Sequence, residues 1–155
     1  MEVRPLDDAD RPWVHDACER EWGLPVVSPS GAWDPSTLDG FLAVDDGGEP
    51  LGAVAYRVVT GQCEIVALFS VEERRGIGTA LLDAVARAAT GCWRLWLITT
   101  NDNLHALGFY QRRGWDLVAL HRDWIDHVRR LKPDVGSRQS GGIPFRHAIE
   151  LELRL

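Results

Sequence analysis

The sequence SVEERRGIGTALLDAV, residues 70–85, places two arginines and two glycines directly in front of an apolar pattern. Apolar residues recur from position 77 to position 88 at helical spacing, which predicts an amphipathic helix over 77–88. The preceding stretch 63–71 is almost entirely apolar, which predicts a strand buried on both faces. A strand, a glycine turn and the start of a helix therefore follow one another directly.

This order of elements is typical of an anion site. The first-turn N–H groups of a helix have no helical partners, and the helix dipole adds partial positive charge there. Gly76 and Gly78 lack the Cβ atoms that would keep a phosphate away from the backbone. Thr79 adds a hydroxyl, and Arg74 and Arg75 add full positive charge. A simple tight turn is the alternative, and the two arginines favour the anion site.

The rest of the chain predicts a mixed α/β fold. No internal repeat is present, so we expect a single domain over residues 1–155. A loop with one helical turn after Pro35 is expected over 28–40. A first helix, between Pro12 and Gly23, would bury Trp13, Val14, Ala17 and Cys18 on one face. Further helices are expected at 101–113 and 123–131, and strands at 3–6, 41–44, 51–59, 93–99, 115–121 and 143–155.

Composition excludes several classes of function. The net charge of -6 argues against nucleic-acid binding, and no apolar run approaches the length of a membrane span. The acidic beginning of the chain lacks the pattern of a signal peptide, so we expect a cytoplasmic protein. The three cysteines have no metal-ligand spacing, and we expect no metal. Residues 1–50 hold twelve of the 23 acidic side chains, which suits a cationic substrate or is ordinary solvated surface.

Two motifs together resemble the GNAT superfamily of acetyl-CoA-dependent N-acetyltransferases. GIGTALL after an apolar strand is similar to the family element Gln/Arg-x-x-Gly-x-Gly/Ala, here Glu73 to Gly78 with Glu at the first position. NLHALGFYQRRGW, residues 103–115, is similar to the element Asn-x-x-Ala-x-x-Phe-Tyr-x-x-x-Gly-Phe. Nucleotide-binding alternatives fail, because no Gly-Lys-Ser/Thr loop is present and Leu81 stands where a dinucleotide site needs Gly or Ala. The whole sequence also resembles a bacterial group of the family without an assigned substrate.

The resemblance implies a central, mostly antiparallel twisted sheet of about six to seven strands, flanked by helices. A splayed strand pair would hold acetyl-CoA as co-substrate. The family pairs the backbone of the strand end with the pantetheine arm, and a bulge there would supply an N–H to the thioester carbonyl. The implied cofactor-binding residues are Leu68, Phe69, Ser70, Val71, Arg74, Arg75, Gly76, Ile77, Gly78, Thr79, Asn103 and Tyr110. Asn103 would bond the cofactor or cap its own helix, and Asp102 competes for that cap.

The resemblance also implies two catalytic residues. Glu64 opens the apolar strand at the position of a general base in some members, and half-burial would raise its pKa; a carboxylate exposed at the strand end is the alternative. Tyr110 takes the position of a general acid beside the CoA sulfur, with a core aromatic as the alternative. Trp22, Trp33 and His121 are candidate substrate contacts.

The leading interpretation is an N-acetyltransferase that moves an acetyl group to a primary amine, with a cationic small molecule or a protein as acceptor. A non-catalytic acyl-CoA sensor or protein-interaction module on the same fold is the alternative. Either would be a monomer or a homodimer, without nucleic-acid or membrane partners.

Overall fold

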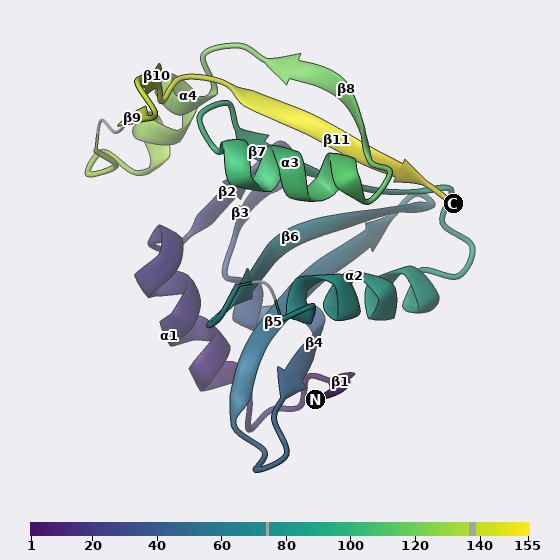
Figure 1. The fold of residues 1–155 in the computed structure, drawn as a ribbon. Helices are drawn as coiled ribbons and strands as arrows, with labels where there is room; N and C mark the ends of the chain where they lie inside the picture. Colours follow the sequence, from purple (N-terminus) through teal and green to yellow (C-terminus); the bar gives the residue numbers. More distant parts are fainter. Residues whose placement is uncertain (74, 137–138) are drawn as a thin grey trace. The chain divides into compact units, whose positions relative to one another are not determined.

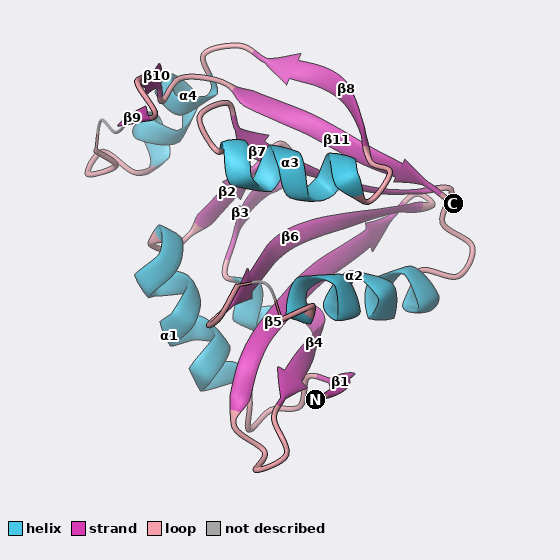
Figure 2. Ribbon diagram, viewed as in Figure 1, coloured by secondary structure: helices cyan, strands magenta, loops and turns pink. Residues whose placement is uncertain are grey.

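The computed structural model describes residues 1–73, 75–136 and 139–155. The fold is mixed α/β, with a seven-stranded, mostly antiparallel sheet and four α-helices among the described residues, as the sequence predicts (Figure 1, Figure 2). Two compact units are present, Met1–Leu95 with Leu155 and Trp96–Arg154, and a single domain over the whole chain stays a prediction. Within the described part, no helix has the length and apolarity needed to cross a membrane.

Four neighbouring antiparallel strands form the sheet of the first unit. Their order is β1 (Glu2–Pro5), β4 (Asp39–Val44), β5 (Pro50–Val59) and β6 (Gln62–Ser70). The expected loop over 28–40 instead begins with a hairpin, β2 (Val26–Ser28) and β3 (Gly31–Trp33). Strands of three residues are too short to show an alternating pattern. The helical turn after Pro35 is confirmed as a short 3-10 helix, η1 (Pro35–Thr37).

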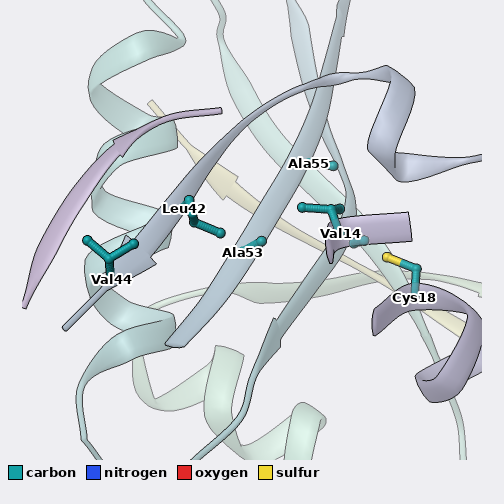
Figure 3. Close-up of a cluster of buried hydrophobic side chains, with 7 residues drawn as sticks. Val14, Cys18, Leu42, Val44, Ala53 and Ala55 are labelled. Carbon is teal, nitrogen blue, oxygen red and sulfur yellow. The ribbon is translucent and has the colours of Figure 1, made fainter. Parts of the chain in front are cut away.

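Helix α1 (Arg11–Trp22) packs on one face of this sheet through the predicted apolar positions Val14, Ala17 and Cys18. Figure 3 shows Val14 and Cys18 against the small and branched side chains of β4 and β5. Asp10 stands at the N-cap position of α1 but makes no side-chain cap, because its carboxylate binds the Arg4 guanidinium at 2.7 and 2.9 Å. The ion pair ties the start of α1 to β1.

Helix α2 (Ile77–Ala88) lies against the strands of the same unit, on the face away from α1 (Figure 1). Its buried positions are the predicted apolar ones, among them Ile77, Leu81 and Val85. The helix begins after Gly76, whose φ of 73° lies in the left-handed region that glycine adopts without strain. The strand–turn–helix order predicted from the sequence is confirmed.

A β-bulge interrupts the pairing of β5 with β6. Ala55 pairs with Ala67 and Tyr56 with Ile65, so Val66 is an extra residue in β6. In its pairing with β5, β6 shifts register here and not over 68–71, where a bulge was expected. Alternate residues of a strand face opposite sides, and Ala53 and Ala55 face α1. Arg57 and its partner Glu64 therefore face that side as well.

The second unit contains most of β7 (Arg94–Thr100) and the elements that follow it. These elements follow in the order α3 (Leu104–Arg112), β8 (Asp116–His121), α4 (Trp124–Leu131), β9 (Gln139–Ser140), β10 (Ile143–Pro144) and β11 (Ala148–Arg154). Strands β8 and β11 pair with each other in antiparallel fashion. The long strand expected over 143–155 is thus divided, because residues 143–144 pair with 139–140. Asn101, expected at a helix start, instead bonds the Pro144 carbonyl and the backbone N–H groups of Arg146 and His147.

Gly52 is expected to tolerate no side chain. A Cβ at Gly52 would stand 2.6 Å from the Phe69 carbonyl oxygen and 3.0 Å from Ile77 Cγ2, so β5, β6 and α2 would have to separate. We expect Gly52→Ala to lower the free energy of unfolding by about 1–3 kcal/mol in urea titrations, the usual cost of overpacking. Gly47→Ala is the matched control, because its Cβ would meet only Asp45 Oδ1 at 3.4 Å. Equal stability of the two variants would contradict this packing.

Candidate active site

Glu64 is buried in the first unit, with 3% of its surface exposed. Its Oε1 atom accepts a hydrogen bond from Ser30 Oγ at 2.5 Å and lies 3.4 Å from Arg57 Nη1. The alternative of a carboxylate exposed at a strand end therefore does not hold. Both partners bind Oε1, and no described residue gives Oε2 a hydrogen bond.

The Ser30 hydroxyl has all of its hydrogen-bonding capacity engaged. An ionised carboxylate only accepts, so the Ser30 proton points to Glu64. Trp33 Nε1 donates to Ser30 Oγ at 3.1 Å, and Ser28 Oγ lies 2.8 Å away. Because the Ser30 proton is already used, Ser28 must be the donor of that pair. The β2–β3 hairpin thus presents one fixed hydroxyl to one carboxylate oxygen.

Arg57 completes this cluster from β5. It stands directly opposite Glu64 in the strand pairing, and its Cζ atom lies 3.8 Å from the Trp33 ring centroid. A guanidinium over an indole face is a cation–π contact. The Arg57 side chain is 22% exposed and that of Glu64 5%. We call Ser28, Ser30, Trp33, Arg57 and Glu64 the hairpin cluster.

Of the candidate substrate residues, Trp33 belongs to the hairpin cluster and Trp22 lies in an aromatic group. The Trp22 and Phe69 rings meet edge to face at 5.9 Å, and Trp13 lies 5.6 Å from Phe69 on the same face. His121 lies in the second unit, where Nε2 is 3.0 Å from Glu150 Oε1 and the ring is 5.8 Å from Trp124. Its contact with substrate stays a prediction.

Asp34, one of the carboxylates in the acidic first part of the chain, is engaged in local structure. Its Oδ1 accepts from the N–H and hydroxyl of Ser36 at the start of η1, and its Oδ2 lies 2.7 Å from His15 Nδ1. Partial burial raises the pKa of Asp34, but the bonds from Ser36 and His15 outweigh burial and lower the pKa overall. The hydrogen bond to Asp34 raises the pKa of His15.

The end of β6 and the turn after it contain most of the predicted cofactor residues. Phe69 faces α1, while Leu68 and Ser70 alternate to the other face. The Val71 N–H bonds the Leu51 carbonyl at 2.8 Å, so it is not available to a ligand. Ser70 Oγ donates to the Glu72 carbonyl at 3.0 Å.

The first turn of α2 follows. The Ala80 N–H bonds the Gly76 carbonyl at 3.0 Å, and Ile77, Gly78 and Thr79 form the first turn of the helix. Arg75 Nη1 lies 2.8 Å from Glu72 Oε2, and both side chains are more than half exposed. Arg74 lies outside the described residues.

Tyr110 and Asn103 lie in the second unit, on and before α3. The Tyr110 ring is buried between Phe109 and Trp115, each at 5.1 Å, and burial raises the pKa of its hydroxyl well above the ordinary value. The Asn103 side chain caps α3 by accepting from the Ala106 N–H at 3.2 Å, while its amide donates to Thr99 Oγ1. Asn103 and not Asp102 is thus the cap, and a cofactor contact of Asn103 stays a prediction.

Sequence reasoning missed three members of the hairpin cluster, Ser28, Ser30 and Arg57. The position of Arg57 could have been predicted. The turn at Thr60 and Gly61 pairs Val59 with Gln62, and counting two residues away from the turn along each strand brings Arg57 opposite Glu64. Ser30 gave no signal, because it lies in the short hairpin that the pattern does not show.

The sequence profile described as "Acetyltransferase (GNAT) family" matches residues 7–115. The chain therefore belongs to the GNAT family of acetyltransferases, and it is an acyltransferase. The family that the motifs resemble is thus confirmed.

The chain is also similar to individual proteins. "Uncharacterized protein YdhI" of Bacillus subtilis strain 168 is 38% identical over 152 residues, which cover 96% of this chain and 95% of that protein. The chain shares its fold with an "IAA acetyltransferase" from Bacillus cereus ATCC 14579; the TM-score is 0.71, the identity 20%, and 99% of both chains is covered. It also shares its fold with a GNAT family acetyltransferase from Elizabethkingia anophelis with acetyl-CoA bound. There the TM-score is 0.72 and the identity 18%, with 99% of this chain and 97% of that one covered.

The His15–Asp34 pair gives a pH-dependent prediction. Because the pKa of His15 is raised, its contribution to stability is complete below the unfolded value of about 6.5 and is lost as the pH rises through the folded value. We expect an NMR titration to place the His15 midpoint above about 6.5. Asp34→Asn keeps an oxygen for Ser36 but removes the charge, so the midpoint should fall toward the ordinary value. The other four histidines, all in the second unit, are the control, and an unchanged His15 midpoint would refute the pair.

Proposed function

We propose that this acetyltransferase moves the acetyl group of acetyl-CoA to a primary amine, with Glu64 as the residue that takes the proton. The observation that supports this most is the asymmetric hold on the Glu64 carboxylate. Ser30 and Arg57 fix Oε1, while no described residue bonds Oε2. A fixed carboxylate with one open oxygen suits a general base.

The start of α2 fits the pyrophosphate of acetyl-CoA. The left-handed φ of Gly76 explains why glycine stands there, as the tight-turn alternative requires, and a Cβ on Gly76 would meet no atom within 4 Å. Gly78 is different, because it lies inside the helix, where glycine costs about 1 kcal/mol relative to alanine. The turn does not need that glycine, whereas a phosphate close to the backbone does.

Acetyl-CoA, when bound, supplies the acetyl group as a thioester whose carbonyl carbon bonds to the amine nitrogen while the bond to sulfur breaks. The amine must be neutral to attack, and its nitrogen must lose a proton to become an amide. Glu64 Oε2 takes that proton, directly or through one water. Ser30 and Arg57 keep the carboxylate from rotating, since both bonds are made to Oε1.

Tyr110 is the proposed proton donor to the leaving sulfur. Its hydroxyl is protonated at neutral pH, and burial raises its pKa further. A cytoplasmic location, a monomeric or dimeric state and the roles of Leu68 to Val71 in cofactor binding stay predictions.

Binding of acetyl-CoA is the first measurement. Calorimetric titration should show one site per chain, weakened at least about 10-fold by Gly78→Glu, because a carboxylate at the first turn of α2 repels the pyrophosphate. The same substitution suits the helix dipole, so the fold should persist. Gly136→Glu, in an exposed part of the second unit, adds the same charge as a control, and free adenosine diphosphate tests the nucleotide alone. No binding of acetyl-CoA or a longer acyl-CoA would overturn the proposal.

Glu64→Gln and Tyr110→Phe test the two proton transfers. Each variant keeps the shape of the side chain, so acetyl-CoA affinity should not change. We expect the rate of thiol release with an amine acceptor to fall about 10²–10⁴-fold, the usual contribution of a positioned acid or base.

Matched controls exist for both variants. Glu152 is a second buried strand carboxylate with an arginine partner, Arg154, at 2.8 Å, and Tyr56 is the second tyrosine of the chain. Glu152→Gln and Tyr56→Phe should leave turnover unchanged. Full activity of Glu64→Gln and Tyr110→Phe would show that these roles are wrong and would favour an acyl-CoA sensor or different catalytic groups.

A further inference from the structure

We propose that the amine acceptor is a free α-amino acid, whose carboxylate binds Arg57 while its amine faces Glu64. This inference rests on the proposed transfer to an amine and specifies the substrate of that same site. It replaces the expectation of a purely cationic acceptor, which the acidic first fifty residues weakly favoured.

The first step is the placement of two opposite charges on one face. The bulge at Val66 puts Glu64 on the face of β6 that carries Ala67 and Phe69, and strand pairing puts Arg57 directly beside it. A cation and an anion therefore stand side by side at the β2–β3 hairpin, Arg57 Nη1 and Glu64 Oε1 being 3.4 Å apart.

The second step is the hydrogen-bonding capacity of Arg57. A guanidinium has five N–H donors, and the described residues engage Nη1 alone, in a bond to Glu64 at the long end of the normal range. Trp33 lies under the guanidinium and fixes it, while 22% of the side chain stays exposed. A fixed, accessible guanidinium is the group that binds a carboxylate with two parallel hydrogen bonds.

The third step is the spacing of the two charges. An α-amino acid carries its amine and its carboxylate on the same carbon atom, so its carboxylate can meet Arg57 while its nitrogen lies beside Glu64. An acceptor that arrives as an ammonium first gives one proton to solvent, and the neutral amine gives its next proton to Glu64 Oε2 as the amide forms. A polyamine carries no anion and would bring positive charge toward Arg57. A peptide N-terminus carries a neutral amide where the amino acid has its carboxylate.

The Asp34 carboxylate is engaged inside the protein and does not serve a cationic acceptor. It is the carboxylate nearest to Trp33 in the sequence, and it is already bonded to His15 and Ser36. The acidic residues of the first part of the chain thus include one whose charge is used inside the protein.

The experiment compares three acceptor series with the full chain and acetyl-CoA, following thiol release. Each L-amino acid is matched with its C-terminal amide and with its decarboxylated amine; phenylalanine, phenylalaninamide and 2-phenylethylamine form one such set. We expect kcat/KM for the best acid to exceed that of its amide and amine at least about 30-fold, the loss typical of removing one partner from a desolvated charge pair.

Arg57→Gln should remove this preference. All three acceptors share any loss that comes from the weaker hold on Glu64, but kcat/KM for the acid should fall further, mainly through KM, so that its ratio to the amide and the amine approaches one. Arg57→Lys keeps the charge without the two-pronged geometry and should retain part of the preference, which covers the case that the glutamine variant folds poorly. Arg94 also lies over an indole, that of Trp93 at 5.2 Å, and Arg94→Gln is the matched control that should keep the wild-type ratio.

Three results would overturn the inference. Amides or decarboxylated amines that react as fast as the acids would leave amine transfer intact but exclude carboxylate recognition. An equal loss for all three series in Arg57→Gln would make Arg57 a support for Glu64 only. No reaction with any series, in a protein that binds acetyl-CoA, would exclude amino acids, and polyamines and peptides would then test the transfer itself. Absence of acetyl-CoA binding would instead refute the proposed function.

Discussion

One extra residue in a strand, Val66, determines what the site can do. Without the bulge, the alternation set by Phe69 and Ala67 would continue to Ile65, and Glu64 would face α2. With it, Glu64 turns toward α1 and the β2–β3 hairpin, where Ser30 and Arg57 bind it. A bulge changes the direction of a side chain and interrupts the hydrogen-bond ladder locally. Bulges are frequent beside active sites.

The direction that the bulge gives to Glu64 depends on close packing of the sheet on both of its faces. Small side chains on β4 and β5, chiefly Ala53 and Ala55, let α1 lie close to the sheet, and Gly52 lets the backbone of β6 and Ile77 of α2 approach the other face. The end of β6 is therefore confined from both sides. Glu64 lies near the start of β6, and the glycine turn follows the end of the same strand and leads into α2. The distance between Glu64 and the glycine turn within the first unit is therefore fixed by covalent geometry and packing.

The sequence predicts much of this fold because most elements follow a simple period. Helix α2 keeps its apolar positions over three turns, and β6 is an apolar stretch bounded by turns, so both are found within a residue or two. Glu64 and the glycine turn were found through motifs. The bulge at Val66 and the hairpin that carries Ser30 were not, because a bulge depends on the pairing with a second strand and three-residue strands have no visible period. Arg57 needed only the register from the turn at Thr60 and Gly61.

On this account the Arg57 guanidinium serves two carboxylates. In the empty site its Nη1 atom lies 3.4 Å from Glu64 Oε1. A substrate carboxylate would bind the N–H donors that Glu64 does not use, so that one side chain holds both the base and the acceptor. Before substrate binds, the pair keeps both charges compensated at a site with little solvent contact. The same arginine thus stabilises the empty site and, on this account, recognises the acceptor.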